Sequence, residues 1–331
     1  MVEKIDFDIS RTEMGWSKKF GVDYNHLPEF SSMRRFIDNL DNSFVHVFGG
    51  IRSSRNLRRI IRYLLINGKR VFVQSEAPNY FGLNGLYRIL RVPIDNFLFY
   101  RKIEAVFAIG SLGFEFYRKN LPRECKVFPW AYFIAEANLQ TEAKNSSGRF
   151  NILYLGSLTK TKGVIYLLRA LANIDLDFHL SIIGNGPELG KLRKFVSAGP
   201  HLKDKVTFKG FIQNNGVQDI MATQDLLVLP SINKDGWGVV VSEALSVGTP
   251  VIVSEKCGSA VLLSDPIRGS IVEAANVASL RNAIIIQMEK GKVKKKTRDE
   301  IVKWAKCLSA TKAAEFMIDC INKKDTTAPW L

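Results

Sequence analysis

Short apolar segments that alternate with helical patterns constrain the fold of this chain more than any other feature. In the second half they are FNILYLG (150–156), DFHLSIIG (177–184), KVTFKG, DLLVLP and PVIVSE, rich in Val, Ile and Leu. Near-continuous apolar strands separated by helices indicate a parallel sheet covered on both faces. The first half repeats the theme in SFVHVFGG, RVFVQSE, AVFAIGS and KVFPW. We therefore predict an α/β fold of two doubly wound, Rossmann-like domains that face each other across a cleft.

The domain boundary is predicted in ANLQTEAKNSSGR (137–149), a polar segment rich in Ser and Asn that is typical of a linker. A chain of 331 residues is long enough for two domains of ordinary size. We expect an N-terminal domain over 1–148 and a second domain over 149–300. The remainder, 301–331, is the C-terminal helical region. Its helical pattern spans roughly 298–322, and we expect this helix to cross back to the first domain.

Composition and charge narrow the class of protein. The chain is 46% hydrophobic and 24% charged, which suits globular domains. It has no run of about eighteen apolar residues, so no membrane-spanning helix is predicted. MVEKIDFDIS lacks the apolar core of a signal peptide, so we expect a cytoplasmic protein, either free or peripheral on the inner face of the plasma membrane. The net charge of +15 indicates an anionic partner: nucleic acid, a membrane surface or a phosphorylated substrate.

The four cysteines show no spacing that is typical of metal ligands, and we expect free thiols in a reducing compartment. They are Cys125, Cys257, Cys307 and Cys320.

The segment DGWGVVVSEALSVGTPVIVS (235–254) follows a buried-looking strand and places Asp235 and Glu243 eight positions apart. Ligands of open parallel sheets bind beyond the carboxyl ends of the strands, where this segment begins. Gly236 and Gly238 let backbone approach a ligand, and a helix predicted to begin near Gly238 offers unpaired amides to an anion. One interpretation places a phosphate here, with sugar hydroxyls at either carboxylate. The other is a helix-capping aspartate and a solvated glutamate.

Two further glycine loops are predicted at the same sheet edge, in LYLGSLTKTKG (153–163) and IIGNGP (182–187). Small backbone, a hydroxyl and ammonium groups suit a diphosphate. Each loop alone is ordinary turn chemistry, but three that converge on one edge favour a phosphate-binding site. The residues concerned are Gly156, Ser157, Lys160, Lys162, Gly184 and Gly186.

GSLTKTKG, IIGNGP, a Phe-Lys-Gly turn, DLLVLPS and DGWGVVVSEALSVGTPVIVS occur in this order over roughly residues 150 to 285. In order and spacing they resemble the donor domain of the retaining glycosyltransferases of family 4, which have the GT-B fold. That family usually carries Glu-x7-Glu, where this sequence has Asp235-x7-Glu243. The resemblance implies that Glu243 binds the donor ribose and that Asp235 contacts the transferred sugar. Backbone amides would come from Gly236, Trp237 and Gly238.

The resemblance also implies contacts to the rest of the donor. Lys162 matches the family's diphosphate lysine, and Phe211 lies where the family's backbone meets the nucleobase. The family often has Arg directly after the strand glycine, whereas here Ser157 occupies that position, and we expect Lys160 to supply the missing charge. Asp235 and Lys162 are therefore the candidate catalytic residues.

A donor of this kind loses a nucleoside diphosphate, which we expect to be UDP, while the sugar becomes oxocarbenium-like. Lys162, Lys160 and the helix amides would stabilise the charge that builds on the β-phosphate. We see no Asp-x-Asp metal motif in the sequence. We therefore expect transfer without a metal or cofactor, with the nucleotide sugar as substrate.

In the first half, SFVHVFGG leads into IRSSRNLRRIIRYLLINGKR. On a helix, Arg52, Arg55, Arg59 and Arg62 would share one face opposite an apolar stripe. One interpretation is a solvated basic face. The other is an acceptor phosphate near Gly49, Gly50 and Arg52, with an anionic membrane surface farther along the helix.

Other candidate contacts are weaker. GKVKKKTR (291–298) is a second candidate membrane contact, although a solvated charge run explains it more simply. We expect His46, on the face of Phe44 and Phe48, to be a buried structural residue rather than an acceptor ligand.

The opening of the chain departs from the family pattern. Family members begin with an apolar strand and a glycine-rich loop, whereas EKIDFDIS is short and charged. Either the chain lacks its true N-terminus or its acceptor domain is reduced.

Three functions follow from these observations. The first is transfer of a sugar to a glycan or lipid-linked acceptor in surface polysaccharide biosynthesis, such as lipopolysaccharide or capsule. The second is a catalytically inactive partner that keeps the GT-B fold. A nucleic-acid partner is disfavoured, because the sequence shows no recognised nucleic-acid module.

Overall fold

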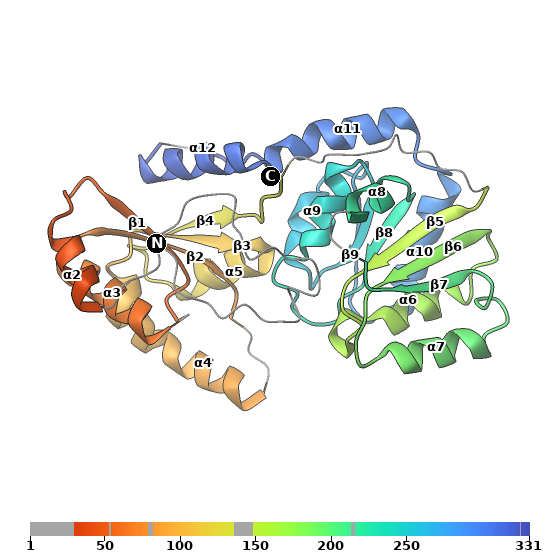
Figure 1. The fold of residues 1–331 in the computed structure, drawn as a ribbon, viewed down its shortest axis with the longest axis horizontal. Coiled ribbons are helices and arrows are strands. Elements are labelled where there is room, and N and C mark those ends of the chain that lie inside the picture. The colour runs from red at the N-terminus through yellow and green to blue at the C-terminus, as the bar shows by residue number, and fades with distance from the viewer. Residues whose placement is uncertain (1–29, 53, 79–81, 136–147, 213–215, 325) are drawn as a thin grey trace. The chain divides into compact units, whose positions relative to one another are not determined.

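The computed structural model describes residues 30–331 except 53, 79–81, 136–147, 213–215 and 325 (Figure 1). Its contacts divide the chain into two compact units, Met1–Trp130 and Ala131–Leu331. Each unit contains a parallel sheet with helices, so the predicted class of two α/β domains is confirmed. Most of the predicted linker, 137–149, lies outside the described residues.

The described part of the first unit is a four-stranded parallel sheet in the order β1-β2-β3-β4. Each strand pairs with the next one along the chain. The elements are α2 (Phe30–Asp38), β1 (Val45–Gly49), α3 (Arg55–Ile66), β2 (Arg70–Glu76), α4 (Gly82–Asp95), the π-helix η1 (Asn96–Tyr100), β3 (Ala105–Ile109), α5 (Gly110–Asn120) and β4 (Lys126–Trp130).

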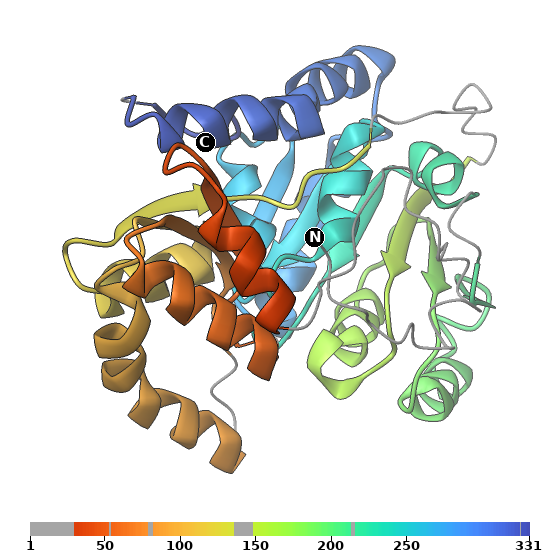
Figure 2. The ribbon, with the colours of Figure 1, turned by 60° about the vertical axis from the view of Figure 1, so that its left-hand side comes forward.

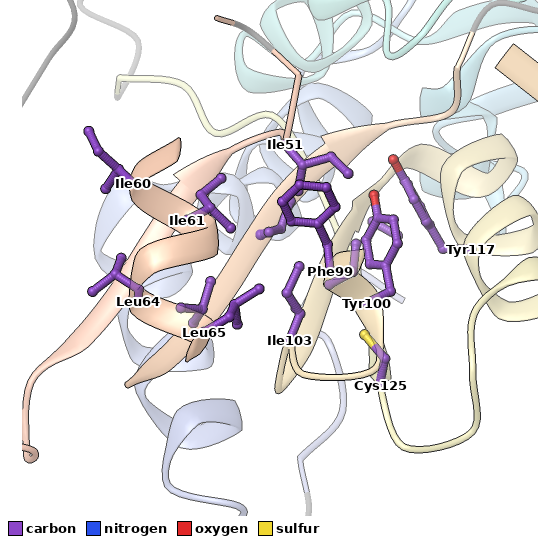
Figure 3. Close-up of a cluster of buried hydrophobic side chains, with 14 of the residues drawn as sticks. Ile51, Ile60, Ile61, Leu64, Leu65, Phe99, Tyr100, Ile103, Tyr117 and Cys125 are labelled. Atoms are coloured by element: carbon purple, nitrogen blue, oxygen red, sulfur yellow. The ribbon is translucent and has the colours of Figure 1, made fainter. Parts of the chain in front are cut away.

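One face of this sheet forms a hydrophobic core with α2, α3, η1 and α5 (Figure 3). Alternate residues of a strand point to opposite faces, so Val71, Val73 and Val106 face this core while Phe72 and Phe107 face the other way. The side chains that α3 contributes to the core are Ile60, Ile61, Leu64 and Leu65. On the opposite face, the rings of Phe72, Phe107 and Phe128 stack across neighbouring strands.

The basic helix begins later than its sequence pattern indicates. The Ser54 side chain accepts a hydrogen bond from the Leu57 amide at 3.0 Å and caps α3, so the helix starts at Arg55. Arg52 therefore lies in the loop after β1 and not on the basic face with Arg55, Arg59 and Arg62, which corrects that prediction. His46 is half-buried, and burial, followed by the charge of Lys69, lowers its pKa.

The second unit contains a six-stranded parallel sheet in the order β10-β9-β8-β5-β6-β7. Its strands are β5 (Phe150–Leu155), β6 (Phe178–Ile183), β7 (Val206–Gly210), β8 (Leu226–Leu229), β9 (Val251–Ser254) and β10 (Gly269–Val272). The helices between these strands are α6 (Val164–Leu171), α7 (Leu189–Ala198), α8 (Val217–Ala222) and α9 (Val239–Ser246), and α10 (Val277–Glu289) follows β10. The chain leaves β5 toward β6 and later returns to place β8 on the other side of β5. The strand order thus reverses between β5 and β8, and such a switch point opens a ligand crevice at the carboxyl ends.

The predicted single C-terminal helix is wrong in detail. It consists of α11 (Lys295–Ala305) and α12 (Ala310–Ile321), separated by a 3₁₀ turn. The break occurs because the Ser309 side chain accepts a hydrogen bond from the Lys312 amide at 3.3 Å and starts a new helix. Both helices belong to the second unit by their contacts. There, Ile134 and Ser309 form an isolated bridge, and Phe316 packs edge-on against Trp330.

Candidate functional site

The glycine loops after β5 and β6 lie against each other at the carboxyl edge of the second sheet. The Leu158 amide donates to the Asn185 carbonyl at 2.8 Å, and the Gly156 amide donates to Ile183 at 3.0 Å. A Cβ at Gly184, where φ is +139°, would overlap the carbonyl oxygen of Gly156. These glycines therefore permit close packing between two loops, and the sequence pattern could not separate that role from ligand approach.

The loop after β5 also meets the loop after β8, its neighbour across the switch point. The Ile232 amide donates to the Thr161 carbonyl at 2.8 Å, and a Cβ at Gly163 would overlap the carbonyl of Pro230. This contact brings together two predicted site residues that are far apart in sequence. The Lys162 ammonium lies 2.5 Å from an Asp235 carboxylate oxygen, and both side chains are largely buried.

Asp235 is fixed by both its backbone and its side chain. Its amide donates to the Lys256 carbonyl at 2.8 Å, and its carbonyl accepts from the Gly258 amide at 2.9 Å. Its carboxylate accepts from the Ser231 hydroxyl at 2.9 Å, in addition to Lys162. The alternative in which Asp235 caps the helix is wrong, because the N-cap of α9 is Gly238.

Three side chains that sequence analysis did not assign to the site pack against Asp235 and its neighbouring loops. Tyr154 is fully buried, donates its hydroxyl to the Ser157 carbonyl at 2.8 Å, and has a pKa raised by burial and by the negative charge of Asp235. Ser231 is the second partner of the Asp235 carboxylate. The Cys257 thiol donates to the Trp237 carbonyl at 3.0 Å. No sequence signal assigned these side chains to the site, because their role arises from contacts between loops.

The side chain of Trp237 is buried and is not placed to contact a ligand. Its side chain is only 1% exposed, and its indole N–H donates to Ser242 at 2.9 Å. Only its backbone can therefore face a ligand. Gly238 adopts φ +78°, and a Cβ there would lie 2.7 Å from the Cys257 sulfur, so glycine is required for packing as well as for the turn.

Glu243 lies in the second turn of α9 and is half-buried. Burial raises the pKa of its carboxyl, and no hydrogen bond or ion pair connects this group to another described residue. The alternative of a freely solvated glutamate is therefore wrong. A desolvated carboxylate without a partner is costly unless a ligand supplies hydrogen-bond donors.

The remaining predicted residues of this unit are spread around the same edge. Ser157 and Lys160 are exposed, and Lys160 lines a separate small cavity with Tyr166 and Glu188 rather than facing Asp235. Phe211 follows β7 and is 47% exposed.

The sequence does contain an Asp-x-Asp pair, Asp175 and Asp177, which corrects the prediction that it has none. This pair precedes the amino end of β6, where Asp177 pairs with Arg149 at 3.2 Å, so it lies at the opposite edge of the sheet from this site. Among the described residues, no group of three His, Cys, Asp or Glu side chains gathers in an arrangement that would hold a metal.

The first unit has its own cavity, of about 520 Å³, at the carboxyl ends of β1 and β2. The three predicted acceptor-side residues, Gly49, Gly50 and Arg52, all line it. Arg52 forms an ion pair with Asp95, which is 6% exposed. Burial, followed by the charge of Arg91, lowers the pKa of Arg52. Among the described residues, the basic side chains that line the cavity are Arg52 and Arg88.

Helix α4, η1 and α5 complete this cavity with polar groups. The buried Oδ1 of Asn96 has no hydrogen-bond partner among the described residues, although its Nδ2 donates to the Asn120 carbonyl at 2.7 Å. Figure 3 shows the hydroxyls of Tyr100 and Tyr117 directed toward the same side, where Ile51 lies. The Tyr117 hydroxyl donates to Ser75 at 2.8 Å. No sequence signal pointed to Asp95 and Asn96, because they reach the cavity through a π-helical turn, a feature often found at functional sites.

The second unit has the strand order of a doubly wound, dinucleotide-binding type of α/β fold, with glycine loops and a lysine–aspartate pair at its switch point. The sequence profile of the glycosyl transferases group 1 matches residues 137–306, more than half of the chain. The chain belongs to this family.

Comparisons with individual proteins agree with this assignment. The chain is 30% identical over 138 residues to the phosphatidyl-myo-inositol mannosyltransferase of Mycobacterium leprae, a match that covers 40% of this chain and 36% of that protein. The fold resembles that of HepE from Anabaena, solved in complex with UDP, with a TM-score of 0.69, 16% identity and coverage of 89% of this chain and 82% of that one. The lipopolysaccharide outer core galactosyltransferase WaaB, in its apo form, gives a TM-score of 0.69, 15% identity and coverage of 89% and 79%. The chain spans between 33% and 51% of the length of the first curated relatives that it matches.

Proposed function

We propose that this chain transfers a sugar, with retention of configuration, from a UDP-linked donor to a glycan or lipid-linked acceptor in surface polysaccharide biosynthesis. The observation that carries the proposal is the convergence of the β5 and β8 loops, which places Lys162 against Asp235 at the switch point. The UDP complex of HepE and the lipid named in the mannosyltransferase from Mycobacterium leprae support the choice of donor and acceptor class.

In the proposed reaction, the bond between the anomeric carbon and the β-phosphate oxygen breaks, and negative charge grows on the departing diphosphate. The Lys162 ammonium and the unpaired amides at the start of α9 would stabilise that charge without a metal. Binding of the diphosphate would draw Lys162 away from Asp235. The freed carboxylate would then hydrogen-bond to the transferred sugar, while Glu243 would accept hydrogen bonds from the ribose diol.

The acceptor would occupy the cavity of the first unit. Arg52 offers an N–H fork to a phosphate or hydroxyl, and the unpaired Asn96 Oδ1 accepts a hydrogen bond from a sugar hydroxyl. This arrangement of a cation and a buried acceptor suits a polar acceptor end rather than an apolar one.

Calorimetric titration with UDP, GDP and ADP tests the donor assignment. We expect binding of UDP, weakened by about tenfold to hundredfold in Glu243→Ala because two hydrogen bonds to a charged group are lost. Lys162→Ala should bind UDP more weakly and should also lower the rate of UDP-sugar hydrolysis. Ser197→Ala on α7 is the control, since its exposed side chain lies outside the predicted donor-binding residues.

The outcomes separate the candidate functions. UDP binding with turnover supports the transferase. UDP binding without hydrolysis or transfer under any condition would favour the inactive GT-B partner. No binding of any of these nucleotides, or equal binding by the wild type and Glu243→Ala, would overturn the donor site.

A further inference from the structure

Helix α4 and the first residues of η1 carry an apolar stripe that the rest of the described chain does not cover. Tyr87, Leu90, Ile94 and Phe97 are 56%, 66%, 49% and 69% exposed. Their spacing of three, four and three residues places them along one side of a helix. Large apolar side chains scattered singly on a surface are ordinary, but a contiguous stripe marks an interaction surface.

The opposite side of the same helix faces the cavity of the first unit. Arg88, Val92, Asp95 and Asn96 line that cavity. On a helix of 3.6 residues per turn these positions lie roughly opposite the stripe. In Figure 2, α4 projects beyond the other helices of the first unit.

The charges beside the stripe all have one sign. The exposed or half-exposed charged residues of this segment outside the cavity wall are Arg91, Arg101 and Lys102, while its single acidic residue, Asp95, is buried in its pair with Arg52. Both arginines contact the aromatic rings of the stripe. The Arg91 guanidinium lies 5.4 Å from the Tyr87 ring centroid, and that of Arg101 lies 5.8 Å from the Phe97 centroid.

We propose that the α4–η1 stripe, Tyr87, Leu90, Ile94 and Phe97, docks this protein on the surface of an anionic lipid bilayer. Apolar and aromatic side chains would enter the acyl boundary, and the flanking arginines and lysine would meet lipid phosphates. The wider charge distribution agrees, because residues 30–130 contain 17 Arg and Lys but seven Asp and Glu. A second copy is a poorer occupant, since a symmetric interface over this helix would place its arginines against one another.

This surface differs from the two that the sequence indicated. The exposed face of α3 offers mainly charge, and GKVKKKTR continues into α11, where Asp299 and Glu300 lie among its lysines. If the chain is the proposed transferase, a helix that lies on the bilayer with its other side on the cavity would present that cavity to a lipid-linked acceptor. The presentation of the cavity to an acceptor rests on the proposed function, whereas the docking does not.

Vesicle co-sedimentation without donor or acceptor tests the docking independently of catalysis. The probes are phosphatidylcholine vesicles with and without phosphatidylglycerol, at low and high salt. We expect binding to the anionic vesicles that weakens with salt, and a loss of at least about tenfold in Leu90→Glu/Phe97→Glu, because two side chains can no longer enter the bilayer. Arg101→Ala/Lys102→Ala should keep the apolar stripe but lose much of the salt-sensitive part.

The matched control is Ile286→Glu, at a position on α10 of the second unit that is 53% exposed, and it should bind like the wild type. Circular dichroism checks that each variant is folded. No binding to anionic vesicles, or equal losses in Leu90→Glu/Phe97→Glu and the control, would overturn the proposal. Dimerisation in sedimentation velocity that disappears in Leu90→Glu/Phe97→Glu would assign the stripe to a second copy instead. Because UDP binding is measured separately, failure of the docking leaves the donor site untouched.

Discussion

At the scale of single residues, the site is defined by how each charge is satisfied. Asp235 has two side-chain partners, Lys162 and Ser231. Glu243 has none among the described residues and is desolvated. One carboxylate is thus held in a network that a ligand must rearrange, and the other is ready to accept hydrogen bonds. An unpaired, half-buried charge lowers the free energy of unfolding. Such a cost is typical of a residue that is kept for ligand binding.

Glu243→Gln tests this cost directly. Burial raises the pKa of the Glu243 carboxyl above its ordinary value of about 4.5, so the ionised form is penalised in the folded state. The glutamine variant should therefore unfold at a higher denaturant concentration than the wild type at pH 7. That difference should shrink as the pH falls through the raised pKa and disappear below about 4.5, where the glutamate is protonated in both states.

Denaturant unfolding at a series of pH values, followed by tryptophan fluorescence, measures this difference. A stabilisation that is the same at every pH would show that charge is not its cause. A destabilised glutamine variant at pH 7 would contradict the unpaired environment of Glu243.

At the scale of elements, the loops at the switch point hold one another in place. The β6 loop packs on the β5 loop through glycines, and the β5 loop bonds to the β8 loop through Thr161 and Ile232. The position of Lys162 therefore depends on backbone contacts between loops more than on its own short 3₁₀ turn, Lys160–Lys162.

Gly184→Ala should disturb this arrangement. A Cβ would meet the Gly156 carbonyl, and φ +139° disfavours any L side chain, so we expect a loss of about 2–3 kcal/mol in the free energy of unfolding. Gly190→Ala is the control, because Gly190 lies in α7 and a Cβ added there would have no neighbouring atom within 4 Å. At that position, alanine should be neutral or stabilise the protein by up to about 1 kcal/mol. Chemical denaturation of both variants checks the prediction, and equal effects would contradict it.

At the scale of the whole molecule, the two units bury the thiols. Cys125, Cys257 and Cys320 are buried and Cys307 is half-buried, and none is in a disulfide. Burial raises the pKa of Cys307 to about 11 and that of Cys125 to about 12. The scarcity of thiolate follows from packing in both units.

A thiol titration tests this arrangement in solution. At mild alkaline pH the native protein should react slowly with a disulfide reagent such as Ellman's reagent, with Cys307 the first to respond, whereas all four thiols should react once the chain is unfolded. Cys307→Ser should remove the fastest native phase and leave the other three thiols to react in the unfolded state. Rapid reaction of two or more thiols in the native protein would contradict the described packing.

The sequence alone predicted several parts of the fold and of the candidate site: the strands that frame the site, the three glycine loops and the start of α9. It could do so because these features are local: a buried parallel strand needs a continuous apolar run, and a tight loop needs glycine. Local signals also misled. The basic pattern of α3 ran through the cap at Ser54, and the helical pattern at the C-terminus ran through the cap at Ser309.

Tertiary structure alone decided which residues meet and which faces stay uncovered. Lys162 contacts Asp235 across 73 positions because the strand order reverses between β5 and β8, and no periodicity records that. The stripe on α4 and the core stripe on α3 have the same kind of helical spacing, yet Ile61 is buried and Leu90 is 66% exposed. Spacing determines which side chains share a face, whereas only the packing of the other elements determines whether that face meets the core or the solvent.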